Sequence, residues 1–127
     1  MNLKDYFEKT EGTGILATAD KSGKVDAAVY SRPHILDDGS VAFIMRDRLT
    51  HSNLQSNPHA AYLFIEKGPG YKGKRLLLSK IHEEKDTQRL EDLKRRCVSP
   101  EEDLEKGAKF LVAFKIDKEL PLVGPGE

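Results

Sequence analysis

The sequence is poor in the residues that build disulfides and metal–thiolate sites. Its 127 residues include one cysteine, Cys97, and no tryptophan. A lone cysteine excludes an internal disulfide and a cysteine-rich zinc site, and it is typical of a protein of the reducing cytoplasm. The four histidines are scattered, with no helical pair and no carboxylate at ligand spacing. We therefore expect a cytoplasmic protein without a metal site.

Net charge and long apolar runs are also missing. The chain has 21 Lys and Arg residues against 21 Asp and Glu residues, so no overall field draws it to nucleic acid or to a membrane. No apolar run is long enough to cross a bilayer, and the N-terminal residues lack the apolar core of a signal peptide. Hydrolase and glycine-rich nucleotide-binding motifs are absent as well. Any anion-binding site must therefore be a local cluster.

What the sequence does have is a series of short strands separated by turn residues. Turn chemistry at residues 20–23 and 37–39 joins the first three strands as a meander. Six short antiparallel strands in one small domain avoid open edges best by closing into a barrel, so we expect a mainly β, six-stranded antiparallel barrel. The predicted strands are 13–19, 25–36, 41–45, 60–66, 75–81 and 108–116.

Short helices are predicted to cover this barrel. The length favours a single domain over residues 1–127, and residues 118–127 are predicted to be a Pro/Gly tail. The helix signals are the helical spacing of Leu3, Tyr6 and Phe7, an apolar stripe of Leu90, Leu93 and Cys97 over residues 83–98, and a capping box at 99–102 whose helix ends at Gly107.

The segment between the third and fourth predicted strands concentrates basic and polar residues. Arg46 and Arg48 follow the third strand, and Thr50 is placed to cap a short helix. The backbone N–H groups of Ser52 and Asn53 would then point outward beside the two arginines, as an anionic group requires. The alternative interpretation is a capped connecting helix with solvent-exposed arginines.

Other polar side chains are predicted to lie near this segment. Tyr30, Ser31 and Arg32 come late in the second strand, and meander pairing would place them opposite the end of the third. A glycine-rich loop at 67–73 carries Lys72 near its tip. A ligand with a flat polar ring and a phosphate tail would match this surface.

The order of these features between residues 25 and 64 resembles the pyridoxamine 5′-phosphate oxidase-like, FMN-binding split-barrel family. The shared order is a strand, a short turn, a second strand, a basic and polar turn, a helix ending in Asn57-Pro58 and an apolar strand. The resemblance implies a split β-barrel that binds FMN at a homodimer interface. It implies a small flavoprotein, not the oxidase itself, that serves as an oxidoreductase or electron-transfer protein with a nicotinamide or another electron donor.

The resemblance also implies which residues bind FMN. The oxidase has an Arg-Lys pair where this chain has Leu49-Thr50, so the phosphate would rest on the Thr50 hydroxyl, backbone N–H groups and Arg46 or Arg48. Ser31, Arg32 or Lys72 would donate to the edge of the flavin ring, and no residue is assigned as acid or base. The positions carried over from the family are Val29, Tyr30, Ser31 and Arg32 for the ring and ribityl chain, and Phe43, Ile44, Met45, Arg48, Leu49, Thr50 and Asn53 for the ring edge and phosphate.

Two alternatives remain at this stage. One is a carrier or sensor without turnover that binds haem or flavin, in which His51 or His82 would be the axial haem ligand. The other is a reductase that uses a deazaflavin in place of FMN. A barrel that serves only as a structural or protein-binding unit is less favoured, because it leaves the basic turn and the glycine loop unexplained.

Overall fold

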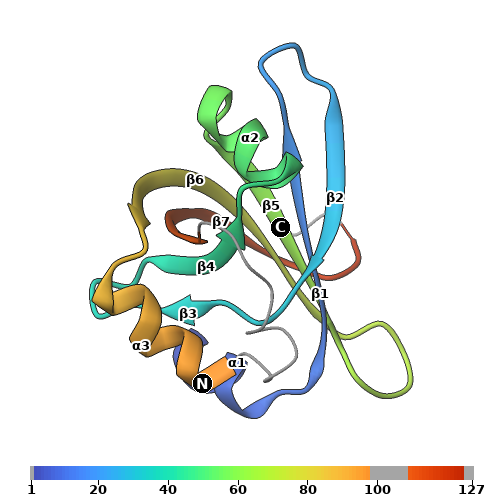
Figure 1. Ribbon diagram of the computed structural model, residues 1–127. Coiled ribbons are helices and arrows are strands. Elements are labelled where there is room, and N and C mark those ends of the chain that lie inside the picture. The colour runs from blue at the N-terminus through green and yellow to red at the C-terminus, as the bar shows by residue number, and fades with distance from the viewer. Residues whose placement is uncertain (1, 98–108, 125–127) are drawn as a thin grey trace.

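A computed structural model describes residues 2–97 and 109–124 of the chain, which form a strongly curled antiparallel sheet with three short helices (Figure 1). The strands lie side by side in the order β2-β1-β5-β6-β7-β4-β3. The elements are α1 (Leu3–Lys9), β1 (Gly12–Ala19), β2 (Val25–Tyr30), β3 (His34–Ile35), β4 (Val41–Arg46), α2 (Leu49–Ser56), β5 (His59–Glu66), β6 (Gly73–Lys85), α3 (Gln88–Cys97) and β7 (Lys109–Pro121).

The predicted meander of the first three strands is wrong in one respect. β1 and β2 form the expected hairpin, with Gly14 opposite Tyr30 and Ala19 opposite Val25. The expected second strand, however, is interrupted between Tyr30 and His34. Only the two residues of β3 continue it, and they pair with β4, whereas β2 stays with β1. The sheet therefore has seven strands where six were predicted, and no ladder in the described residues joins β2 to β4.

The interruption falls at a proline. Pro33 is buried, and it has no backbone N–H to donate to a ladder. Because β2 lies at one edge of the sheet and β3 and β4 lie at the other, the chain crosses between the two edges at residues 31–33. The barrel is split at this crossing.

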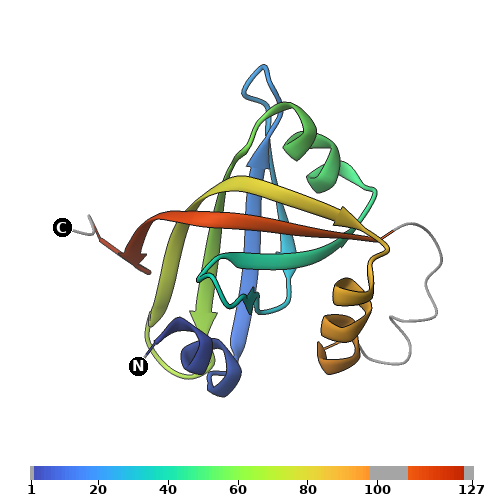
Figure 2. The same cartoon turned by 90° about the vertical axis from the view of Figure 1, so that its left-hand side faces the viewer.

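β6 and β7 are much longer than predicted. Both have 13 residues, and they pair from Lys74 opposite Pro121 to Lys85 opposite Phe110, with two irregularities in register. Figure 2 shows the two strands arching side by side across the molecule. The helix predicted over 83–98 is present but begins only at Gln88, because 83–85 are strand. The tail predicted from residue 118 is wrong over 118–121, which are strand. The helix predicted at 99–107 lies outside the described residues.

The core has two parts. The larger one fills the inside of the curled sheet, where α1 closes one end with Phe7. The smaller one lies between the sheet and α3, whose Leu90 is fully buried. The largest buried side chains of the inner core are Tyr62, Phe64, Phe114, Leu16, Leu76 and Leu78, and Leu111 belongs to the smaller part.

The Tyr62 hydroxyl holds the crossing in place. Tyr62 is fully buried on β5, and its hydroxyl donates to the Ser31 carbonyl at 3.1 Å. The hydroxyl passes β1 at Gly14, where a Cβ atom would overlap it. Burial raises the pKa of Tyr62 well above its usual value, so the group stays a donor at any physiological pH.

We predict that Tyr62→Phe lowers the free energy of unfolding by about 1 kcal/mol, because the Ser31 carbonyl loses its hydrogen bond while the ring still fills its place. Urea unfolding measures the change. Tyr71→Phe, at a side chain that is 83% exposed, is the matched control and should unfold as the wild type does. Equal stability of Tyr62→Phe and the wild type would contradict this account.

Candidate functional site

An open cleft of about 710 Å³ lies where the two edges of the sheet approach each other. One wall comes from the end of β2 and the crossing that follows it, and the floor comes from β4. The third side is the first turn of α2. The lining residues are Gly12, Thr13, Gly14, Asp26, Ala28, Val29, Tyr30, Ser31, Arg32, His34, Phe43, Ile44, Met45, Arg46, Arg48, Leu49, Thr50 and Lys109.

The cleft combines apolar and polar groups. Val29 and Leu49 are 75% and 58% exposed, so apolar surface is open to a ligand or to a partner. Tyr30 lies edge to face on Phe43, with ring centroids 6.0 Å apart. Burial raises the pKa of Tyr30, although a hydrogen bond with Thr50 and the charge of Arg48 oppose the shift. The Tyr30 phenol therefore faces the cleft in its neutral form.

The first turn of α2 differs from the prediction that Thr50 caps the helix. The N-cap is Arg48, whose side chain makes no capping hydrogen bond, and Thr50 is the buried second residue of the helix. The Ser52 N–H already donates to the Arg48 carbonyl at 2.9 Å. The N–H groups without an intrahelical acceptor are therefore those of Leu49, Thr50 and His51, because the N-cap lies two residues earlier than expected. They lie at the cleft, since Leu49 and Thr50 line it.

Side chains of α2 anchor the helix to three different strands. The Thr50 hydroxyl meets Tyr30 of β2. The Asn53 amide donates to the Thr18 hydroxyl of β1 at 3.0 Å. His51 reaches β6 on the side of the helix that does not line the cleft.

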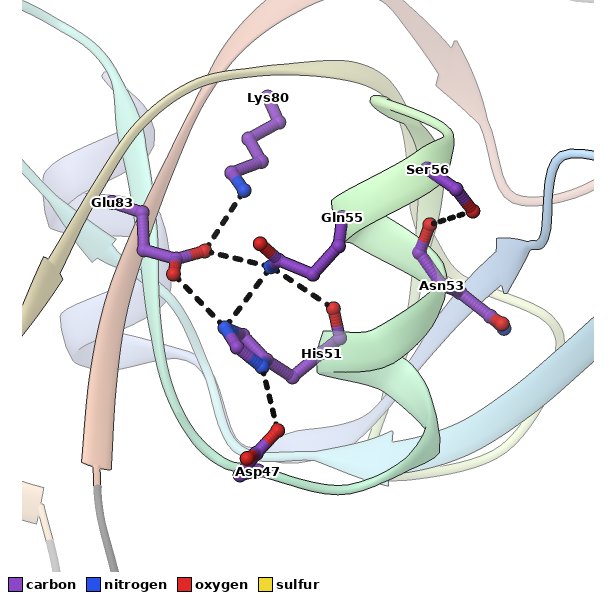
Figure 3. Close-up of polar contacts among 7 residues, drawn as sticks. All are labelled: Asp47, His51, Asn53, Gln55, Ser56, Lys80 and Glu83. Atoms are coloured by element: carbon purple, nitrogen blue, oxygen red, sulfur yellow. Dashed lines mark hydrogen bonds and ion pairs between the residues drawn. The ribbon is translucent and has the colours of Figure 1, made fainter.

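His51 lies at the centre of a polar network (Figure 3). Its Nδ1 is 3.0 Å from Asp47 Oδ1 and its Nε2 is 3.0 Å from Glu83 Oε2. The other oxygen of Glu83 accepts from Gln55 at 3.0 Å and pairs with Lys80 at 2.8 Å. The His51 ring, which is only 5% exposed, stacks on Phe110 of β7.

The structure brings most of the predicted site residues together. Every predicted position on β2, on β4, in the crossing and in the first turn of α2 lines the cleft. Two others do not. Asn53 is turned toward Thr18, and Lys72 is exposed in the β5–β6 loop.

The sequence reasoning missed the contribution of β1 and β7 to the cleft. Lys109 is only 8% exposed and lies opposite Arg46 in the β4–β7 ladder. In the sequence, Lys109 is recognisable only as a lysine at the start of an apolar strand. Its position at the cleft follows from the pairing of β7 with β4. Gly12 and Gly14 line the cleft beside β2, and their close contacts with Ile65 and Tyr62 explain why both are glycine.

We predict that stability depends on Glu83 in acid. Desolvation acts to raise its pKa, but hydrogen bonds from Lys80, His51 and Gln55 outweigh it and lower the pKa to about 2. A carboxylate with a depressed folded pKa stabilises the fold above its unfolded pKa, near 4.5, and that contribution is lost as pH falls toward 2.

The free energy of unfolding of the wild type should therefore fall between pH 4.5 and 2 more steeply than that of Glu83→Gln. Urea titrations at a series of pH values measure both slopes. Parallel slopes would show that Glu83 does not contribute.

Comparison with known proteins finds no matching family model and no matching curated sequence, whereas the fold matches many solved structures. An FMN-binding protein from Syntrophomonas wolfei subsp. wolfei has 18% identity and a TM-score of 0.76, with 97% of this chain and 85% of that chain covered. A candidate pyridoxamine 5′-phosphate oxidase from Lactobacillus delbrueckii has 16% identity and a TM-score of 0.68, covering 94% and 92%. The haem storage protein HutZ of Vibrio cholerae has 14% identity and a TM-score of 0.70, covering 94% and 91%.

The chain has the split-barrel fold of the pyridoxamine 5′-phosphate oxidase-like proteins. The same fold occurs in an F420 reductase, so the neighbours include an FMN-binding protein, an F420 reductase and a haem storage protein. No helix in the described part of the chain is long and apolar enough to span a membrane.

The residues of the cleft fit FMN chemically. N–H groups of a helix N-terminus and the nearby cations Arg46 and Arg48 suit a phosphate. The apolar surface of Val29 and Leu49 suits the flat ring, and the cleft volume lies in the range of small-molecule sites. A flavin nucleotide requires both kinds of group in one site.

Proposed function

We propose that this protein binds FMN in the cleft and works as a flavoprotein oxidoreductase or electron carrier. The observation that carries the proposal is that the first turn of α2, with Arg46 and Arg48 nearby, opens onto a cleft that also exposes the apolar side chain of Val29. The fold likeness to an FMN-binding protein supports it. Bound FMN would supply hydride or single-electron transfer, and the protein would bind and orient it.

The roles within the cleft follow from position. The phosphate would meet the N–H groups of Leu49 and Thr50 and the side chain of Arg48. The ring would lie along β4, and the polar groups of Ser31 and Arg32 at the crossing would face its edge. Arg32 is oriented by a hydrogen bond from its Nη1 to the Thr10 carbonyl at 3.0 Å.

We predict that the purified protein is yellow or takes up FMN on titration, and that Arg48→Met weakens FMN binding about tenfold because one charge-assisted contact to phosphate is lost. Quenching of flavin fluorescence measures the dissociation constant. Lys21→Met removes a positive charge from the tip of the β1–β2 hairpin and should leave the constant unchanged.

A colourless protein that binds no FMN would end the proposal. Anaerobic bleaching of the bound flavin by NADH or NADPH would identify a nicotinamide as the electron donor. Competition between FMN and a deazaflavin decides which of the two the cleft prefers.

Haem is less well supported than flavin. The proposed axial ligand His51 is buried, does not line the cleft and has a carboxylate oxygen 3.0 Å from each ring nitrogen, so iron could reach neither nitrogen without displacing a carboxylate. His82 is exposed on β6, is hydrogen-bonded to Glu84 and does not line the cleft. The visible spectrum of the protein separates the two cofactors directly.

We also propose that two copies of the chain form a homodimer through β2. Val25 and Val29 are 79% and 75% exposed on this edge strand, next to the cleft. Exposed apolar side chains on an unpaired edge strand favour association. The FMN site would then lie at the interface.

We predict a dimer by light scattering coupled to size exclusion, and a shift toward monomer in Val25→Glu, because a buried carboxylate would oppose contact. Ile81→Glu places the same charge at a side chain that is 52% exposed on β6 and should remain dimeric. A wild-type monomer would contradict the interface.

A further inference from the structure

The residues of the His51 network lie outside the lining of the cleft. None of Asp47, His51, Gln55 and Glu83 lines it. A buried histidine held by two carboxylates is costly to build unless every polar group is satisfied, and here the contacts are complete. We therefore looked for a role of the network other than contact with a ligand in the cleft.

The contacts determine which part of the molecule the network holds. Asp47 precedes α2 in the turn that carries Arg48, and Glu83 belongs to β6, so the His51 ring joins the turn to the sheet. Phe110 of β7 supports one face of the ring, with centroids 3.8 Å apart. His51 is thus fixed from the turn, from β6 and from β7 at once.

The charged groups that face the ring also fix its hydrogen bonding. Asp47 and Glu83 present oxygens to the two nitrogens, and Lys80 pairs with the far oxygen of Glu83. Each ring nitrogen therefore has one carboxylate oxygen within hydrogen-bonding distance. The Gln55 amide donates to Glu83 Oε1 at 3.0 Å and to the His51 carbonyl at 3.2 Å, and so joins the same carboxylate to α2.

A short helix needs such support. α2 has eight residues and no side-chain cap at Arg48, and isolated helices of this length are not stable in water. The direction of its first N–H groups therefore depends on tertiary contacts. His51 is the third residue of the helix, so its side chain holds the same turn whose N–H groups face the cleft.

We propose that His51 is a positioning residue that aims the first turn of α2 at the phosphate of FMN, an inference that rests on the proposed function. Its contacts with Asp47, Glu83 and Phe110 lie outside the cleft lining. Loss of these contacts therefore disturbs phosphate binding and leaves the ring-binding surface intact. The inference thus distinguishes FMN from riboflavin, which has the same ring but no phosphate.

The test compares the dissociation constants of FMN and riboflavin by fluorescence quenching. His51→Phe keeps the stack on Phe110 and removes both carboxylate contacts, and Glu83→Gln keeps the shape of the network but removes one charge. We expect each variant to bind FMN about tenfold more weakly and riboflavin within about twofold of wild type. The control His82→Gln, on the same strand as Glu83 but outside the network and the cleft, should change neither constant.

Any other result contradicts either the positioning role of His51 or the proposed function. If the variants weaken the binding of both ligands alike, or of neither, the positioning role of His51 is overturned. The proposed function still stands in that case when the wild type binds FMN. Retained riboflavin binding also reports that the variant is folded. A wild type that binds neither ligand overturns the proposed function, and the inference fails with it.

Discussion

The cleft depends on the passage of the chain from one edge of the sheet to the other. Residues 31–33 belong to neither ladder, so nothing in the regular hydrogen bonding of the sheet fixes them. The Tyr62 hydroxyl supplies that fixation from inside the barrel, through the space that Gly14 leaves open. If β2 continued directly into a ladder with β4, the sheet would close, and the surface that now lines the cleft would be covered.

The second requirement is the placement of α2 over the opening. Three side chains within four residues tie this helix to β2, β1 and β6, in the order Thr50, Asn53 and His51. Asn53 is an example of a residue that was predicted to contact the cofactor and that instead holds the helix on the sheet. The family resemblance carries it to the cofactor, whereas in this chain its amide is occupied by Thr18 in a buried contact. Its effect on a ligand would pass through the position of the helix.

The sequence was informative where the signal is local. The turn at residues 37–39 forms as predicted, with Gly39 N–H donating to the Leu36 carbonyl, and Asp38 accepts from Ser40. Pairing of distant strands carries no such signal, and the errors lie there. Residues 83–85 are charged and precede a helix, so their sequence resembles a helix start, but the β7 strand opposite them extends β6 by pairing. Tertiary pairing overrides local propensity in this segment.

The same limit explains what was missed at the site. Lys109 could be assigned to the cleft only with the β4–β7 register, which sets it opposite Arg46. Like charges directly opposite each other in a ladder repel, and both side chains line one cleft beside the N-terminus of a helix. Lys109 therefore adds a second basic side chain to the side of the cleft where Arg46 and the N-terminus of α2 lie. This part of the site follows from the pairing of distant strands, for which the sequence carries no local signal.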